Sequence, residues 1–228
     1  TPMTAPTQAR PVVLVSGAAR RIGAVIAQTL HAAGHDLALH CRNSRDDLDQ
    51  LIAKLERERP NSTLALQADL SDLTQMPALI EATMQRFGRL DGLVNNASDF
   101  FATAFGSVTS EQWDRLFASN ARAPFFLAQA AAPQLKKTGG AIVNLLDIYA
   151  ERPLAGHSVY CMAKAAQAAM THALALELGP EVRVNGVAPG AVMWPEADSD
   201  AAHRAKIIER TPLKRTGQPA EIADAVLW

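Results

Sequence analysis

The chain has 228 residues, of which 48% are hydrophobic and 20% are charged, with a formal net charge of −1. This composition is that of an ordinary soluble globular protein, and it offers no basic excess that would favour nucleic-acid binding. No apolar run approaches the roughly 18 residues that a membrane-spanning helix needs. The polar, proline-rich start, TPMTAPTQARP, lacks the apolar core of a secretory signal, and Met3 is a candidate native start.

The chain contains two cysteines, Cys41 and Cys161. Two cysteines at this spacing form neither a disulfide framework nor a metal-ligand pattern. Disulfides are rare in cytosolic proteins. We therefore expect two free thiols in a reducing compartment, a cytoplasmic protein and no bound metal.

Short apolar runs alternate with helical patterns along the chain. The apolar runs are nearly continuous, as in strands covered on both faces, and predict strands at residues 12–16, 37–41, 64–68, 92–96, 141–146 and 182–188. Apolar positions at helical spacing and alanine-rich stretches predict helices at 22–33, 48–55, 76–87, about 110–136 and 158–179. Gly34 and Gly88 are suited to end the first and third of these helices.

Strands that alternate with helices imply right-handed βαβ units. No linker, repeat or low-complexity segment divides the chain. We predict an α/β fold, a single Rossmann-like doubly wound parallel sheet with helices on both faces, formed as one domain over residues 1–228. In such sheets the ligand binds beyond the carboxyl ends of the strands, so the chemistry is expected there.

The first predicted strand ends in SGAARRIG (16–23). Gly17 can make a tight turn, and Gly23 lets the next helix start close to the sheet, where free N–H groups suit a pyrophosphate. The spacing differs from G-x-G-x-x-G, and in isolation a purely structural turn fits equally well. The position of the turn between a strand and an amphipathic helix favours a nucleotide site.

The second predicted strand is followed by Arg42, where a dinucleotide site that prefers NAD usually has an acid. Asn43 and Ser44 come next. Guanidinium and hydroxyl donors suit the 2′-phosphate of NADP, and the alternative is a solvated basic loop.

Two further strand ends carry polar residues. Asp69 could accept a hydrogen bond from adenine or cap the next helix, and Ser71 could also be that cap. The fourth strand ends in NNAS (95–98). Its small and amide side chains allow the backbone to approach a ligand closely, and the alternative is a turn with a structural role only.

Tyr160 and Lys164 are four residues apart, so a helix places them on one face. A lysine cation beside the phenol is expected to lower the pKa of Tyr160 and to make it a general acid near neutral pH. Tyr149 has no basic residue at a matching offset. The alternative for Tyr160 and Lys164 is an amphipathic surface pair.

Together these motifs resemble the short-chain dehydrogenase/reductase family, from Val12 to about Trp228. The family patterns T-G-x-x-x-G-x-G, N-N-A-G and Y-x-x-x-K are similar to residues 16–23, 95–98 and 160–164, and the P-G turn to 189–190. Members continue to a final strand, so the resemblance predicts a C-terminal strand that this chain lacks.

Three departures resemble the pteridine reductase branch of the family. Arg21 replaces the middle glycine of the turn, Asp147 stands in place of a serine, and NNAS replaces NNAG before Asp99 and Phe100. PGAVMWPE (189–196) is similar to bacterial members of that branch. The resemblance implies NADPH-dependent reduction of dihydropterins, such as dihydrobiopterin, dihydromonapterin or dihydrofolate, by a homotetramer assembled through its two long helices.

The resemblance also implies a set of site residues. The expected catalytic residues are Asp147, Tyr160, Lys164 and Asn120. The expected substrate-binding residues are Arg21, Ser98, Phe100, Asp147, Tyr160 and Trp194. The expected cofactor-binding residues are Gly17, Arg20, Arg21, Ile22, Gly23, His40, Arg42, Asn43, Ser44, Asp69, Leu70, Asn95, Ala97, Ser98, Tyr160, Lys164, Pro189 and Gly190.

Asp147 bears on the type of bond that is reduced. Ketone reduction develops negative charge on oxygen, which an ionised carboxylate opposes. Reduction of C=N requires a proton at nitrogen, which a carboxyl group can relay, and burial would help this acid to hold a proton. The rivals are a carbonyl reductase for a ketoacyl, sugar or steroid substrate, and a non-catalytic NADPH-binding regulator.

Overall fold

A computed structural model of the protein describes residues 10–194 and 201–228, so the expectation for Met3 and the end of the PGAVMWPE segment lie outside the described residues. Six strands form one sheet in the order β3-β2-β1-β4-β5-β6, and each neighbouring pair is parallel. The strands are β1 (Val12–Val15), β2 (Asp36–Cys41), β3 (Thr63–Gln67), β4 (Gly92–Asn95), β5 (Ala141–Leu145) and β6 (Arg183–Val187). All six predicted strands are confirmed, and every end agrees to within one residue.

The predicted helices are also present. The helical elements are α1 (Arg21–Ala32), α2 (Arg45–Glu58), η1 (Leu73–Gln75), α3 (Met76–Phe87), α4 (Ser110–Phe117), η2 (Ala118–Arg122), α5 (Ala123–Thr138), η3 (Ile148–Ala150), α6 (Ser158–Leu178), α7 (Ala201–Arg210) and α8 (Pro219–Leu227). Gly88 ends α3 in the left-handed conformation, with φ of 73°, as expected of a C-cap glycine.

The segment predicted as one helix at about 110–136 is divided into three. Between α4 and α5, η2 is a short π-helix that contains Asn120. The Asn120 side-chain amide donates to the Leu116 carbonyl one turn earlier, at 3.0 Å. This bond occupies a carbonyl of the preceding turn and accompanies the local widening of the helix.

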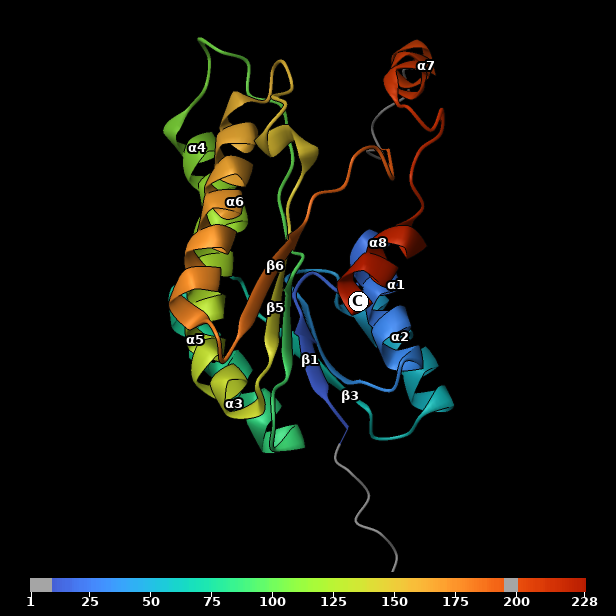
Figure 1. Ribbon diagram of the computed structural model, residues 1–228, viewed down its shortest axis with the longest axis vertical. Coiled ribbons are helices and arrows are strands. Elements are labelled where there is room, and N and C mark those ends of the chain that lie inside the picture. The colour runs from blue at the N-terminus through green and yellow to red at the C-terminus, as the bar shows by residue number, and fades with distance from the viewer. Residues whose placement is uncertain (1–9, 195–200) are drawn as a thin grey trace, which may run out of the picture.

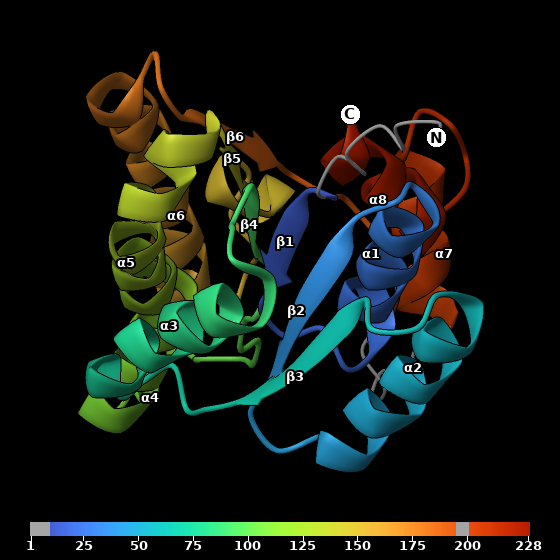
Figure 2. The same ribbon diagram turned by 90° about the horizontal axis from the view of Figure 1, so that it is seen from below.

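Two layers of helices cover the sheet. Figures 1 and 2 show α3, α5 and α6 on one face and α1, α2 and α8 on the other. Side chains of β1 alternate between them: Leu14 joins the core under α3 and α5, whereas Val13 and Val15 join the core under α1 and α2. Because both faces are buried, the apolar runs in the sequence are continuous. The doubly wound α/β fold is therefore confirmed.

The strand order reverses between β1 and β4, which lie side by side at the centre of the sheet. In a doubly wound sheet, the loops that leave the two central strands at this reversal diverge and open a crevice. The loops after β1, β2, β4 and β5 carry the motif residues, so the topology gathers them at one edge. Within the described residues, no helix is long and apolar enough to cross a membrane.

Candidate active site

The turn after β1 requires glycine at two positions. Gly17 has a φ of +63°, and a Cβ atom on it would lie 2.9 Å from the Ala97 Cα. A Cβ atom on Gly23 would lie 2.2 Å from the Gly17 carbonyl oxygen. The start of α1 thus presses directly against the turn, as the sequence predicted.

Polar side chains join the ends of β1 and β4. The buried Ser16 hydroxyl accepts hydrogen bonds from the backbone N–H groups of Asn96 and Ala97, both at 3.0 Å. The Asn96 side-chain amide donates in return to the Ser16 and Gly17 carbonyls, at 3.0 and 2.9 Å. Asn96 was not among the predicted site residues, although the doubled asparagine of NNAS was the signal for it.

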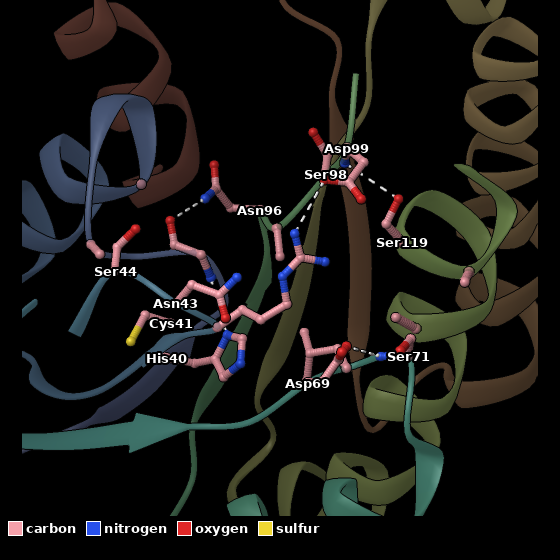
Figure 3. A pocket seen from close by; sticks show the side chains of 18 of the residues that line it. His40, Cys41, Asn43, Ser44, Asp69, Ser71, Asn96, Ser98, Asp99 and Ser119 are labelled. Carbon is pink, nitrogen blue, oxygen red and sulfur yellow. Dashed lines mark hydrogen bonds and ion pairs between the residues drawn. The ribbon is translucent and has the colours of Figure 1, made fainter. Parts of the chain in front are cut away.

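A cavity of about 760 Å³ opens between these turns, on the carboxyl side of the strands. Figure 3 shows His40 and Ser44 on one side of it, and Asp99 and Ser119 on the other. Most of the predicted cofactor-binding residues line it, namely Gly17, Arg20, Arg21, Ile22, Gly23, His40, Arg42, Asn43, Ser44, Asp69, Leu70, Ala97 and Ser98.

Asp99 links two walls of the cavity. Its carboxylate lies 3.7 Å from Arg42 Nη2, from the loop after β2, and 2.8 Å from Arg115 Nε, from α4. The hydrogen bond with Asp99 raises the pKa of the Arg115 guanidinium. Sequence reasoning missed the place of Arg115, because nothing near it in the chain indicates that α4 faces this loop.

The buried His40 ring holds the glycine turn by hydrogen bonding. Its Nδ1 accepts the Gly17 N–H at 3.3 Å, so Nε2 carries the proton and donates to the Ala68 carbonyl at 3.1 Å. Burial lowers the pKa of His40 and keeps the ring neutral.

The helix cap predicted after β3 is at a different residue. Asp72, and neither Asp69 nor Ser71, caps η1 by accepting the Thr74 N–H at 3.0 Å. Asp69 instead accepts the Ser71 N–H at 2.9 Å, and this bond is the largest cause of its lowered pKa. The ionised Asp69 carboxylate lies in the wall of the cavity.

Asn95 was predicted to contact the cofactor, but it does not line the cavity. It is buried, and its amide nitrogen donates to Asn144 Oδ1 at 2.9 Å and to the Pro124 carbonyl at 3.3 Å. Because β4 alternates, Asn95 points into the core and Asn96 toward the loop. The structural role therefore falls to Asn95.

Asp147 and Tyr160 form the central pair at the end of β5. The Tyr160 hydroxyl donates to Asp147 Oδ2 at 2.7 Å, and Asp147 Oδ1 accepts the Tyr149 N–H at 2.9 Å. Burial, followed by the charge and hydrogen bond of Asp147, raises the pKa of Tyr160 above its ordinary value. The prediction that Lys164 lowers this pKa is wrong, because burial and the adjacent Asp147 carboxylate both raise it.

Lys164 is buried, with 3% of its surface exposed. Its ammonium donates to the Leu145 carbonyl at 2.7 Å and to Gln167 Oε1 at 3.0 Å, and lies 6.0 Å from the centre of the Tyr160 ring. Burial lowers the pKa of Lys164 to about 8. It is therefore no surface partner of Tyr160, which removes the amphipathic alternative.

Aromatic residues surround the Tyr160 ring. Phe100 contacts it edge to face at 4.8 Å and stacks on His157, with ring centres 4.8 Å apart. Tyr149 packs in the same apolar cluster. Phe100 thus lies beside Tyr160, with one face already covered by His157.

The remaining predicted residues, among them Trp194, Pro189 and Asn120, do not line the cavity. Arg21, which does line it, donates through Nη2 to the Trp194 carbonyl at 3.2 Å. Pro189 accepts the Ile148 N–H at 3.1 Å, which brings the turn at Gly190 next to η3. Asn120 is fully buried and its Oδ1 has no hydrogen-bond partner among the described residues.

The comparisons with known proteins agree with this geometry. A family model described as enoyl-(acyl carrier protein) reductase matches residues 17–228. The chain belongs to the short-chain dehydrogenase/reductase family. It is 36% identical to pteridine reductase 1 of Leishmania tarentolae, over 99% of this chain and 91% of that protein. It is 38% identical to L-xylulose reductase of Bos taurus, over 94% and 86% of the two chains, and 31% identical to a 3-oxoacyl-(acyl-carrier-protein) reductase of Staphylococcus aureus, over 94% and 88%.

Membership of the short-chain dehydrogenase/reductase family makes the protein an oxidoreductase with a nicotinamide dinucleotide cofactor. The cavity fits such a cofactor, because Gly17 and Gly23 leave the start of α1 bare and no side chain caps that helix at Arg20. Both cysteines are free, as expected, and both are buried. Among the described residues, no group of three or more His, Cys, Asp or Glu side chains could hold a metal ion.

Proposed function

We propose that this short-chain reductase uses NADPH to reduce a C=N bond of a dihydropterin, such as dihydrobiopterin, dihydromonapterin or dihydrofolate, to the tetrahydro level. The observation that carries the proposal is the 2.7 Å hydrogen bond from the Tyr160 hydroxyl to the Asp147 carboxylate. A carboxylate accepts hydrogen bonds and cannot donate one, so it is poorly suited to hold the carbonyl oxygen of a ketone.

The pair suits a reaction in which nitrogen gains a proton. When bound, the nicotinamide cofactor would supply the hydride for the carbon of the C=N bond. The Tyr160 hydroxyl donates a hydrogen bond to Asp147, so the two groups together could deliver a proton to the adjacent nitrogen and regain one from solvent. Asp147 is held for this task by the Tyr149 N–H, and Tyr160 by its place on α6.

The proposed choice of NADPH rests on the loop after β2. Arg42, Asn43 and Ser44 line the cavity, and the Ser44 hydroxyl makes no capping bond at the start of α2. A guanidinium with neighbouring hydroxyl and amide donors matches a phosphate dianion.

The other predicted residues take supporting roles in this proposal. Lys164 would hold the nicotinamide ribose, and Asn120 would support a water-linked proton route. Arg21 would neutralise the pyrophosphate and reach the pterin carbonyl, and Ser98 would bridge cofactor and substrate. The pterin ring would lie beside Phe100, with Trp194 closing the pocket.

A steady-state assay tests the proposal. NADPH oxidation is measured with dihydrobiopterin and with dihydrofolate, for the wild type, Asp147→Ser and Asp72→Ser. The wild type is expected to reduce at least one pterin, and Asp147→Ser to lose about 10²- to 10⁴-fold in kcat. Asp72 is a matched control because it also caps a short helix, through the Thr74 N–H, but on η1.

Two outcomes would reject the proposal. If the wild type turns over no pterin, the substrate class is wrong. If Asp147→Ser keeps full activity, the carboxylate has no part in proton transfer.

The alternative is a reductase that acts on a ketone. It is favoured by the similar identities to the xylulose and 3-oxoacyl reductases. A panel of ketoacyl, sugar and steroid ketones distinguishes it. Only this alternative predicts turnover of a ketone and no turnover of pterins. Tight NADPH binding without turnover of either class would indicate a non-catalytic binding protein.

We also propose that the protein assembles as a homotetramer through α5 and α6. A second cavity of about 440 Å³ lies between these helices and α4, and its lining includes Phe125, Phe126 and Met170. Phe125 is 39% exposed. Light scattering should give four chains for the wild type and fewer for Phe125→Glu, and a monomeric wild type would contradict the proposal.

A further inference from the structure

Buried polar side chains lie behind Lys164. An ammonium group has three N–H groups, and when it is removed from water each of them needs a hydrogen-bond acceptor. The Leu145 carbonyl of β5 accepts one at 2.7 Å, and Gln167 Oε1 accepts another at 3.0 Å. The acceptors therefore come from the sheet on one side and from α6 itself on the other.

Gln167 is an unusual residue for its position. It is 1% exposed, on the face of α6 that packs against the sheet, where an apolar side chain would bury at lower cost. It follows Lys164 by three residues, so the two side chains meet on the same helical face. Its side-chain oxygen has Lys164 as a charged partner, and this bond offsets the cost of burying the amide.

The turn that bears Gln167 is tied to the sheet. Thr171 Oγ1 donates to the Gln167 carbonyl and accepts from Asn144 Nδ2 of β5, both at 2.9 Å. Asn144 in turn accepts from Asn95 of β4 at 2.9 Å. This chain of hydrogen bonds sets the distance between α6 and the end of β5, which supply the two acceptors of Lys164.

We propose that Gln167 is a positioning residue, which holds the Lys164 ammonium against β5 so that its third N–H is directed to the side of Tyr160 and the cofactor ribose. The inference rests on the proposed role of Lys164, and it does not depend on which substrate is reduced. A neutral acceptor suits this role, because it satisfies the ammonium without cancelling its charge. The other groups that face Lys164 are Tyr160 and, electrostatically, Asp147.

The test measures the titration of Lys164 directly. Protein labelled with ¹³C at the lysine Cε is followed by ¹H–¹³C correlation spectra over pH, and the Lys164 signal is assigned by its loss in Lys164→Met. The wild-type midpoint is expected near 8. Gln167→Leu should lower the midpoint by about one to two pH units, because an acceptor of the cation is lost, and Gln167→Glu should raise it.

A surface pair provides the matched control. Gln134 accepts from Lys137 Nζ at 2.9 Å, at the same spacing of three residues but exposed on α5. Gln134→Leu should leave the Lys164 midpoint unchanged. If Gln167→Leu and Gln167→Glu also leave it unchanged, the proposal is overturned, even where either variant lowers thermal stability.

A second readout separates this inference from the proposed function. The pH profile of kcat/KM with dihydrobiopterin is measured for the same variants, and its alkaline limb should follow the midpoints found by NMR. Midpoints that move without any pterin turnover would reject the pterin substrate and support the role of Gln167. Pterin turnover with midpoints that do not move would support the pterin substrate and reject the role of Gln167.

Discussion

The Tyr160 hydroxyl and the Asp147 carboxylate are in direct contact, 2.7 Å apart, and no charge of Lys164 intervenes. The Lys164 ammonium instead bonds to Leu145 and Gln167, and it lies 6.0 Å from the centre of the Tyr160 ring. At the end of β5 the candidate site thus holds a phenol paired with an acid. This pairing raises the pKa of Tyr160 and keeps its proton in place.

The contact predicts that the two residues act as a unit. Tyr160→Phe should lower kcat for dihydropterin reduction by about 10²- to 10⁴-fold. The double variant Tyr160→Phe/Asp147→Ser should be little slower than the slower single variant, because both changes interrupt the same proton transfer. The measurement is kcat for the three variants, with the Kd for NADPH as control. Fully multiplicative losses would show that the groups act independently.

The pH dependence should be set by Lys164 on the alkaline side. Its pKa is lowered to about 8, so the cation is present below that pH and is lost above it. The pKa of Tyr160 is raised, so Tyr160 stays protonated over the same range and causes no change in kcat/KM with pH. We expect kcat/KM to fall about tenfold per pH unit above this point.

Lys164→Arg provides the control for the pH profile. A guanidinium remains charged across the range, so the residual activity of this variant should not show the alkaline fall. A wild-type profile that stays flat well above pH 8 would mean that the lysine charge is not needed.

Cofactor preference should depend on Arg42 and its ion pair with Asp99. Arg42→Ala should weaken NADPH binding about 10- to 100-fold and leave NADH binding nearly unchanged, because the guanidinium meets only the additional phosphate. Asp99→Asn removes the carboxylate that lies 3.7 Å from Arg42, so it should tighten NADPH binding by up to about fivefold. Fluorescence titration of the wild type and both variants with each cofactor measures the six affinities. Equal losses for NADPH and NADH in Arg42→Ala would contradict this assignment.

The closeness of α1 to the glycine turn predicts a stability effect. Gly23→Ala would place a Cβ atom 2.2 Å from the Gly17 carbonyl, and should lower the free energy of unfolding by about 1–3 kcal/mol. Gly190→Ala is the control, because its Cβ atom would lie 3.7 Å from Ile148 Cδ1, an ordinary contact. Urea denaturation of both variants measures the difference. A Gly23→Ala protein as stable as the wild type would mean that α1 can shift freely.

Local sequence was sufficient for the elements and for much of the site. Continuous apolar runs identify strands buried on both faces, and helical spacing identifies the layers that bury them. The loop residues that follow these strands, such as Gly17, Arg42 and Asp147, could therefore be placed at one edge of a parallel sheet. Each of these inferences depends only on residues that are close together in the sequence, and the periodicity of apolar residues identifies local structure well.

Partners across the fold could not be predicted in this way. That Asn95 is buried while Asn96 joins the turn depends on the register of β4 beside β1 and β5. That Asp99 meets both Arg42 and Arg115 depends on the approach of α4 to the loop after β2.

The sequence by itself thus determined the class of fold and the edge of the sheet at which the candidate site lies, and it proposed the residues of that site. Only the tertiary structure decided which of those residues touch. It placed Tyr160 against Asp147 instead of Lys164, and it placed the Lys164 ammonium between Leu145 and Gln167. The physical reason is that hydrogen bonds and burial depend on distances between elements, and the strand order sets those distances.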